Sequence, residues 1–217
     1  MIELRDLTVR YGSTVAVDRL TLDLPPGKIY GLLGRNGSGK RSLLSVLASF
    51  RKASAGTIRV GGADPFENAD LMRRTAFIRD TLDVSGQDRI SQVLRMARWL
   101  RPTWDAAYAA RLLDVFELDE RRRIQSLSRG QRSSLGVVLG LAARADLTIL
   151  DEVYLGMDAV ARAAFYRELL ADYLDRPRTI ILSTHLIETA RAQGAGLTLG
   201  PVGIQELFVH LTAGASR

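Results

Sequence analysis

The sequence predicts an α/β protein with a parallel-sheet core, an antiparallel β subdomain at the N-terminus and an inserted helical subdomain. Three observations lead to this fold class. Two alternating segments, residues 2–9 and 15–24, flank a short turn as in an antiparallel hairpin. A buried strand, a glycine-rich loop and a helix follow one another over residues 29–50. Helical patterns then fill residues 88–144, before strand and helix patterns alternate again.

The N-terminal elements follow from local patterns. Pro25-Pro26-Gly27 forces a turn after the hairpin, and residues 29–33 are apolar on both faces, as in a central strand. A helix is expected to begin near Arg41 and to carry the apolar residues 43–50. Residues 57–60 form the next expected strand, because they are followed by a pair of glycines.

The later elements alternate in the same way. The first inserted helix has an apolar face made of Ile90, Val93, Leu94, Ala97 and Leu100. A second helix is expected over residues 107–116. Strands at residues 147–150 and 179–182 flank a long helix at 159–174. Only two short strand-like segments remain at the end, residues 197–199 and 204–211, so the C-terminal part is expected to be reduced.

Length and composition fit one globular domain. The 217 residues, 47% of them hydrophobic, are enough to bury a core, and we expect a single domain with a core at about 1–80 and 145–217 and a helical subdomain at about 81–144. No apolar run is long enough to span a membrane and no secretory leader is visible, so a cytoplasmic location is expected. The absence of cysteine excludes disulfides and thiolate metal sites.

The net charge of +6 raises the question of nucleic-acid binding. The arginines are scattered, however, and the one run, Arg121-Arg122-Arg123, lacks the interleaved aromatic residues of a single-strand binding surface. We interpret this run as a solvated helix end.

A phosphate-binding loop is predicted at residues 34–40. Gly34-Arg35-Asn36-Gly37-Ser38-Gly39-Lys40 matches the P-loop pattern, in which glycines let backbone N–H groups converge on phosphates and the lysine reaches the terminal ones. The helix that follows directs its positive dipole end at the same anion. The alternative is a glycine-rich turn with an incidental lysine. The pattern next requires a serine or threonine for Mg²⁺, but Arg41 stands there and Ser42 comes one place late.

Four further segments carry polar residues at the ends of predicted elements. Ser128, in Leu127-Ser128-Arg129-Gly130-Gln131, stands where a helix N-cap is expected. The predicted strand at 147–150 ends in Asp151-Glu152, a pair in which one carboxylate can orient Mg²⁺ and the other can polarise water. Gly156-Met157-Asp158 precedes the long helix, and Ser183-Thr184-His185 ends a strand. Each segment alone has an ordinary structural explanation.

Together and in this order, the segments resemble the ABC ATPases, a class of P-loop NTPases. Residues 34–40 are similar to Walker A, 127–131 to the LSGGQ signature, 147–152 to Walker B and 156–158 to the D-loop. The resemblance extends over residues 2–190 and implies ATP and Mg²⁺ as cofactors. It implies a nucleotide site that includes Tyr11 against the base, Gly34, Asn36, Gly37, Ser38, Gly39, Lys40, Arg41, Ser42, Ser128, Gly130, Gln131 and Asp158.

The resemblance also implies a mechanism. Two subunits pair head to tail, as a homodimer or with another ABC ATPase, and each ATP meets Lys40 of one subunit and the signature of the other. Glu152 activates water and His185 senses the γ-phosphate, while Ser42, Asp80 and Asp151 are the expected metal ligands. A transmembrane permease is the implied partner, so the chain is expected at the inner face of the cell membrane. No nucleic-acid partner is expected.

Several positions depart from the family pattern. Asp80 replaces the glutamine that usually ends the strand before the helical subdomain. Arg129 replaces the second glycine of the signature, where its side chain can face outward, and Val153 replaces a proline. Arg41 and Asp80 both alter the expected metal site, so the sequence leaves open two readings: a transporter ATPase, or a nucleotide-binding regulatory subunit with little hydrolysis.

Two other hypotheses concern partners. A DNA-associated ABC ATPase would need a long coiled coil or a zinc insert between Walker A and the signature, and the sequence has neither. The permease is expected to dock on the helical subdomain near Trp99, the segment 101–104 and Phe116. Ordinary core packing is the alternative role for these aromatic side chains.

Overall fold

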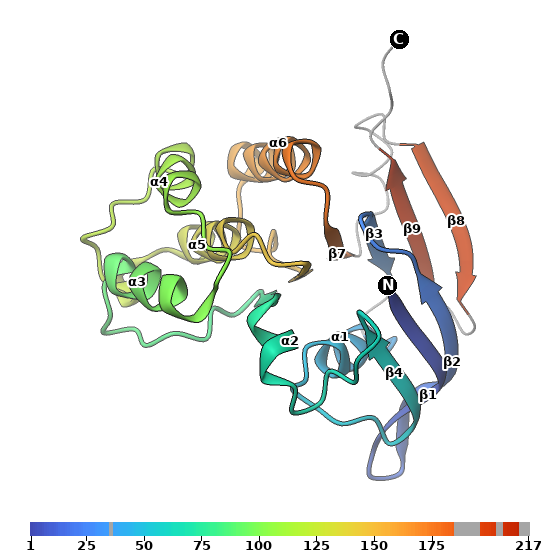
Figure 1. Cartoon of the computed structure of the whole chain (residues 1–217). Coiled ribbons are helices and arrows are strands. Elements are labelled where there is room, and N and C mark those ends of the chain that lie inside the picture. The colour runs from blue at the N-terminus through green and yellow to red at the C-terminus, as the bar shows by residue number, and fades with distance from the viewer. Residues whose placement is uncertain (35–36, 185–195, 203–205, 213–217) are drawn as a thin grey trace. The chain divides into compact units, whose positions relative to one another are not determined.

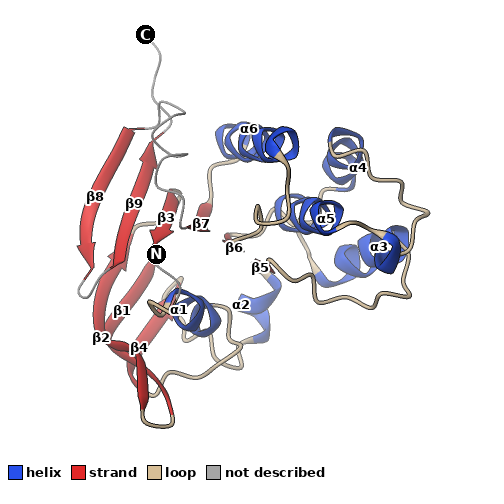
Figure 2. Cartoon of the chain, turned by 180° about the vertical axis from the view of Figure 1, so that it is seen from behind, coloured by secondary structure: helices blue, strands red, loops and turns tan. Residues whose placement is uncertain are grey.

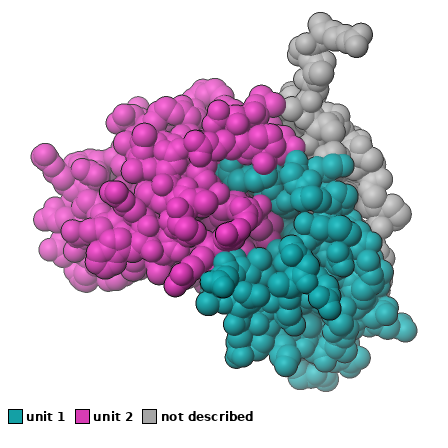
Figure 3. Space-filling view, viewed as in Figure 1, with its two compact units in different colours: residues 1–72, 178–217 teal, residues 73–177 magenta. Residues whose placement is uncertain are grey.

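The computed structural model describes residues 1–34, 37–184, 196–202 and 206–212. The chain divides into two compact units (Figure 3). Residues 1–72 and 178–217 form the first, here called the β-rich unit, and residues 73–177 form the second, here called the helical unit. None of the described helices is long and apolar enough to cross a bilayer.

An antiparallel sheet begins the β-rich unit. Strands β1 (Ile2–Tyr11) and β2 (Thr14–Leu24) form the predicted hairpin, and β4 (Ala55–Val60) pairs with the other edge of β1 (Figure 1). The hairpin turn uses Gly12 at a φ of 59°, a conformation that glycine adopts without steric cost. This sheet places the end of β1, and with it Tyr11, beside the segment that leads into β4.

The second sheet of this unit is built around β3 (Ile29–Leu33), all of whose residues are buried. Strand β3 pairs in parallel with β7 (Thr179–Thr184) and antiparallel with β9 (Glu206–Thr212). Strand β9 in turn pairs with β8 (Gly196–Val202). Figure 1 shows β3, β9 and β8 side by side. The two C-terminal segments form this strand pair: β8 is longer than the expected residues 197–199, and β9 covers most of the expected residues 204–211. The expectation of a reduced C-terminal part stays a prediction.

Helix α1 (Lys40–Leu47) follows the loop after β3, as predicted, but it ends before the expected residue 50. The cause is Ser49, whose φ of 61° lies in the left-handed region and cannot continue the helix. The apolar face of α1 carries the buried side chains of Leu43, Leu44 and Leu47. A short helix that the sequence did not predict, α2 (Ala69–Arg73), buries none of its residues.

The helical unit combines a parallel strand pair with four helices. Strands β5 (Thr75–Arg79) and β6 (Leu147–Asp151) pair in parallel, as expected for the core. The helices are α3 (Ile90–Leu100), α4 (Ala106–Val115), α5 (Arg129–Ala142) and α6 (Ala159–Asp175), with a 3₁₀ turn, η1 (Ile124–Ser126), before α5. The colouring of Figure 2 shows how strands dominate the first unit and helices the second.

A buried ion network joins α4, α5 and α6. Arg144, just after α5, has a side chain only 8% exposed and pairs with Asp172 of α6 and with Asp105 at 3.4 Å. Its guanidinium also lies 4.2 Å from the ring centre of Tyr108. The pKa of Asp105 is lowered, first by the hydrogen bond from the Tyr108 amide and also by the Arg144 charge. These contacts fix the helices that carry the signature segment and Asp158.

Candidate functional site

The phosphate loop of the β-rich unit has a backbone that only glycine tolerates. Gly37 and Gly39 lie in the left-handed region, with φ of 87° and 91°. A Cβ at Gly39 would stand 2.2 Å from the carbonyl oxygen of Ala16. Gly39 is also the N-cap of α1, and it makes no side-chain capping hydrogen bond, because glycine has no side chain. This arrangement suits an anion.

The side chains of the loop fit a phosphate group as well. Lys40 is only 6% exposed, and its Nζ donates to the carbonyl oxygen of Gly34 at 2.5 Å. The Oγ of Ser38 is buried and has no hydrogen-bond partner within the described part of the chain. A buried ammonium and a buried hydroxyl without a partner, at the N-terminus of a helix, are donors that suit a polyphosphate. Asn36 lies outside the described residues.

Arg41 and Ser42 follow in the first turn of α1. The Arg41 side chain is exposed, and its carbonyl oxygen accepts a hydrogen bond from Ser45. Ser42 is half-buried. The predicted metal role of Ser42 stays a prediction, because no group of three or more potential acidic, histidine or cysteine ligands occurs within the described ranges of the chain.

In the helical unit, β6 delivers the predicted carboxylate pair. Asp151 is 2% and Glu152 9% exposed, so both are buried at the end of the strand. Glu152 has a φ of 52°, a strained conformation for a residue other than glycine, and such strain concentrates at functional sites. The turn that follows is closed by a hydrogen bond from the Leu155 amide to the Glu152 carbonyl. Asp80, which directly follows β5, is half-buried.

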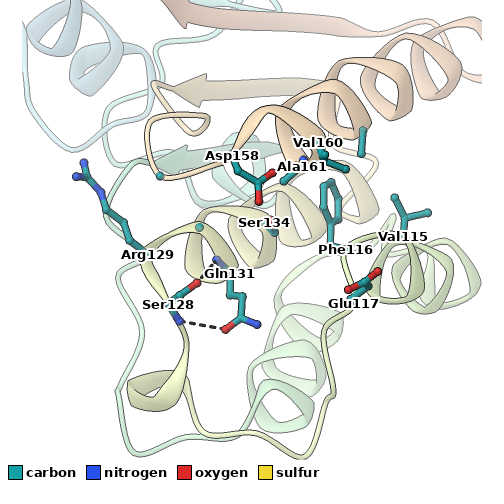
Figure 4. Close-up of a pocket in the computed structure, with 13 residues that line it drawn as sticks. Val115, Phe116, Glu117, Ser128, Arg129, Gln131, Ser134, Asp158, Val160 and Ala161 are labelled. Carbon is teal, nitrogen blue, oxygen red and sulfur yellow. Dashed lines mark hydrogen bonds between the residues drawn. The ribbon is translucent and has the colours of Figure 1, made fainter.

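The signature segment begins α5 with a reciprocal capping box, which confirms the predicted N-cap (Figure 4). The Gln131 amide donates to Ser128 Oγ at 3.1 Å, and the Ser128 amide donates to Gln131 Oε1 at 3.1 Å. A third contact comes from Arg122, whose guanidinium donates to the same Oε1 at 3.2 Å. Arg129 is exposed, as its predicted outward orientation requires.

The arginine run at residues 121–123 makes contacts that its interpretation as a solvated helix end does not include. Arg121 and Arg122 lie in the turn before η1, and Arg123 is the N-cap of η1. The Arg122 guanidinium donates to the Ser126 carbonyl at 2.5 Å, and that of Arg123 donates to Gln87. These contacts could not be predicted from the sequence, because they depend on how the connection from α4 to α5 folds.

The signature and the D-loop segment meet within this unit. A Cβ at Gly130 would stand 2.8 Å from the Gly156 carbonyl oxygen, so the two backbones approach as closely as glycine permits. Asp158 caps α6 by accepting the Ala161 amide at 2.8 Å. Figure 4 shows Ser128, Gln131 and Asp158 around one cavity of about 590 Å³, to which Phe116 and Val160 add apolar walls.

The structure places the remaining residues, those predicted to sense phosphate, to dock a partner or to stack on the base, in different surroundings. His185 lies outside the described residues. Trp99 is 84% exposed and is available to a partner, whereas Phe116 is 9% exposed and belongs to the interior. Trp104 packs against Ala76, Ala143 and Ala145. Tyr11 is 46% exposed, and the guanidinium of Arg51, which the sequence did not suggest, lies over its ring.

Comparisons with known proteins agree on one family. Residues 17–154 match the family described as ABC transporter. The chain is 30% identical over 188 residues to the ABC transporter ATP-binding protein YtrB of Bacillus subtilis (strain 168), covering 87% of this chain and 64% of YtrB. The chain spans about three fifths of the length of such curated relatives.

Solved structures give the same fold. An ATP-binding subunit of an ABC transporter superposes with a TM-score of 0.79 at 24% identity, covering 88% of this chain and 82% of the other. A dimeric bacterial ABC transporter cassette gives a TM-score of 0.76 at 18% identity, covering 88% and 90%. The strand order, the phosphate loop and the signature helix therefore have a common explanation: the chain belongs to the ABC transporter family and has the P-loop NTPase fold of the ABC ATPases.

Proposed function

We propose that this chain binds and hydrolyses ATP as the energy-coupling subunit of an ABC membrane transporter. The observation that carries the proposal is the phosphate loop. Its left-handed glycines, the N-terminus of α1 with its positive dipole end and the buried Lys40 together support the binding of a polyphosphate. Family membership supplies ATP as the nucleotide.

The roles of the side chains follow from their chemistry. Lys40 and the amides of the loop hold the phosphates, and Tyr11 stacks on the base. Mg²⁺, when bound, neutralises phosphate charge, and Asp151, Asp80 and Ser42 are its proposed ligands. Glu152 accepts a proton from the attacking water, and the strain at its backbone supports a functional role. His185 is proposed to sense the γ-phosphate.

The signature face is proposed to act on the ATP of a second subunit. Ser128 and Gly130 stand at the N-terminus of α5, where the helix dipole favours an approaching γ-phosphate. Asp158 shares the cavity with them and is proposed to link the two sites of the dimer. Light scattering of Glu152→Gln at saturating ATP tests this step: a doubled mass is expected, and a monomer at high protein concentration contradicts it.

The proposed catalytic role of Glu152 is tested by measuring the release of phosphate from ATP. We expect Mg-dependent turnover that Glu152→Gln abolishes while ATP affinity is retained, because the substitution removes the base and keeps the size of the side chain. Turnover that survives in Glu152→Gln would contradict the role of this residue.

A second candidate function is a nucleotide-binding regulatory subunit with little hydrolysis. The observation that favours it is Arg41, in the position where the P-loop pattern has the metal-binding hydroxyl. Two unit charges about 4 Å apart interact by about 4 kcal/mol at an effective dielectric constant of 20, and a divalent ion doubles this repulsion. The exposed Arg41 side chain can relieve part of it by extending into solvent.

The partner is proposed to be a transmembrane permease, which holds the chain at the cytoplasmic face of the membrane. The exposed Trp99 on α3, together with Met96 at 47% and Leu100 at 59% exposure, supports docking on this helix. Trp99→Ala is expected to weaken copurification with a coexpressed permease while ATP affinity stays unchanged. Unchanged copurification would move the docking surface elsewhere.

A further inference from the structure

The ring of Tyr11 is covered on one face by a cation from a distant part of the chain. The Cζ of Arg51 lies 4.0 Å from the centre of the Tyr11 ring, which is cation–π geometry. Tyr11 ends β1 and is 46% exposed, whereas Arg51 follows α1 and is half-buried. The guanidinium therefore shields one face of the ring while the rest of the side chain stays open to solvent.

The position of Arg51 is fixed by its backbone neighbours. The Ser54 amide donates to the Thr8 carbonyl at 2.8 Å, and the Arg10 amide donates to Ser54 Oγ at 2.9 Å. The Arg51 guanidinium also donates to the Arg10 carbonyl. These hydrogen bonds join the segment after α1 to the end of β1, so the guanidinium is held over the ring by the fold and loses little further freedom there.

A ring held in one orientation binds a flat ligand better than a ring that must first be ordered. The ordering of one side chain costs about 0.5–1.5 kcal/mol when it occurs on binding, and a preformed contact removes part of that cost. A guanidinium is planar and can stack on an aromatic ring, and a cation on one face of the ring does not cover the other face.

We propose that Arg51 is a positioning residue for the nucleotide base: it holds the Tyr11 ring from one face and so presents the other face to a purine. The proposal rests on the function proposed above, in which Tyr11 stacks on the base. Arg51 acts through Tyr11 alone, so it affects the part of the affinity that the base contributes and not the part that the phosphates contribute. The neighbouring Lys52 is placed differently, with its Nζ 5.6 Å from the Phe66 ring.

Isothermal titration of ATP and of inorganic tripolyphosphate, which lacks a base, separates these two parts. Arg51→Ala is expected to weaken ATP binding about two- to fivefold and to leave tripolyphosphate binding unchanged. Arg51→Lys retains the charge but not the plane and is expected to fall between the two proteins. Lys52→Ala removes the same charge one residue away and is the matched control, with both affinities unchanged.

The coupling to Tyr11 is tested by a double substitution. If Arg51 acts through the ring, Tyr11→Ala with Arg51→Ala binds ATP no more weakly than Tyr11→Ala alone. An equal loss for ATP and tripolyphosphate in Arg51→Ala overturns the proposal in favour of a general charge effect. Tighter ATP binding in Arg51→Ala also overturns it, because Arg51 then covers the face that the base needs.

The same titrations distinguish this inference from the function on which it rests. If the unmodified chain binds tripolyphosphate and ATP equally well, the phosphate site stands and the role of Tyr11 and Arg51 falls. If it binds neither ligand, the nucleotide-binding proposal itself fails.

Discussion

Adding one methyl group to Gly130 is expected to disturb the signature segment more than it disturbs the fold. The new Cβ would stand 2.8 Å from the carbonyl oxygen of Gly156, and ordinary contact requires at least about 3.4 Å. Both partners are backbone, so neither can rotate away, and the two segments must separate by about 0.6 Å, the difference between these distances. Crowding of this kind costs about 1–3 kcal/mol, and the better helix propensity of alanine offsets about 1 kcal/mol of it.

A displacement of this size changes where Ser128 meets a phosphate. Because a misplacement of about 1 Å can lower a rate about 100-fold, Gly130→Ala is expected to lower ATP turnover at least about tenfold while costing at most about 2 kcal/mol of stability. Gly136→Ala is the matched control on the same helix. Its Cβ would meet the Ile78 side chain at 2.9 Å, and a side chain can shift.

Phosphate release and urea unfolding of both variants test this reasoning. Gly136→Ala is expected to stay within about twofold of the unmodified turnover, since it lies away from the signature face. Equal turnover of Gly130→Ala and the unmodified chain, or equal losses in the two variants, would refute the claim that the close approach of Gly130 to Gly156 positions the signature.

Three other predictions concern the metal, the helix cap and the ion network. Arg41→Thr is expected to make ATP affinity more dependent on Mg²⁺ and to raise turnover, because it removes a repelling charge and restores a hydroxyl; unchanged values in titrations with and without Mg²⁺ would count against this. Ser128→Ala removes the N-cap of α5 and is expected to cost about 1 kcal/mol in urea unfolding, and an unchanged free energy of unfolding would contradict this. Because the pKa of Asp105 is lowered in the folded state, by the Tyr108 amide first, its contribution to stability is present above its unfolded pKa near 3.9 and is lost as the pH falls through the folded value. Stability measured between about pH 2 and 6 should therefore fall less steeply toward acid in Asp105→Asn, and an identical slope would contradict the assignment.

Most strands could be predicted from the sequence because each is set by a local pattern. The run at residues 29–33 is apolar at every position, and the structure buries all of it. The end of α1 could not be predicted in the same way. Its sequence remains compatible with a helix up to Phe50, and the stop comes from the left-handed Ser49 in the folded chain.

The C-terminal strands show why pairing partners matter. Strand β8 is longer than its local pattern at residues 197–199 predicts, and its length is defined by its pairing with β9, which itself pairs with β3. Non-local pairing of this kind is not visible in a short window of sequence.

The residues of the candidate site also fall into two groups, those predicted from a local pattern and those whose contacts depend on the fold. Ser128 was predicted as an N-cap from its place before an apolar helix, and the capping box confirms it. Arg122 and Arg51 were missed, because each contacts its partner through a fold that brings separate segments together: Arg122 meets Gln131 across η1, and Arg51 meets Tyr11 across β2, β3 and α1.

The central claim is that the loop at residues 34–40 binds the phosphates of ATP, and calorimetric titration of Lys40→Ala tests it most directly. Lys40 is buried and its ammonium already lies within the loop, so its removal leaves the phosphates without their cation. The control is Lys28→Ala, at a position before β3 and outside the loop. We predict that Lys40→Ala loses most of its affinity for ATP while remaining folded and that Lys28→Ala binds as the unmodified chain does. Unchanged ATP affinity in a folded Lys40→Ala protein would contradict the account.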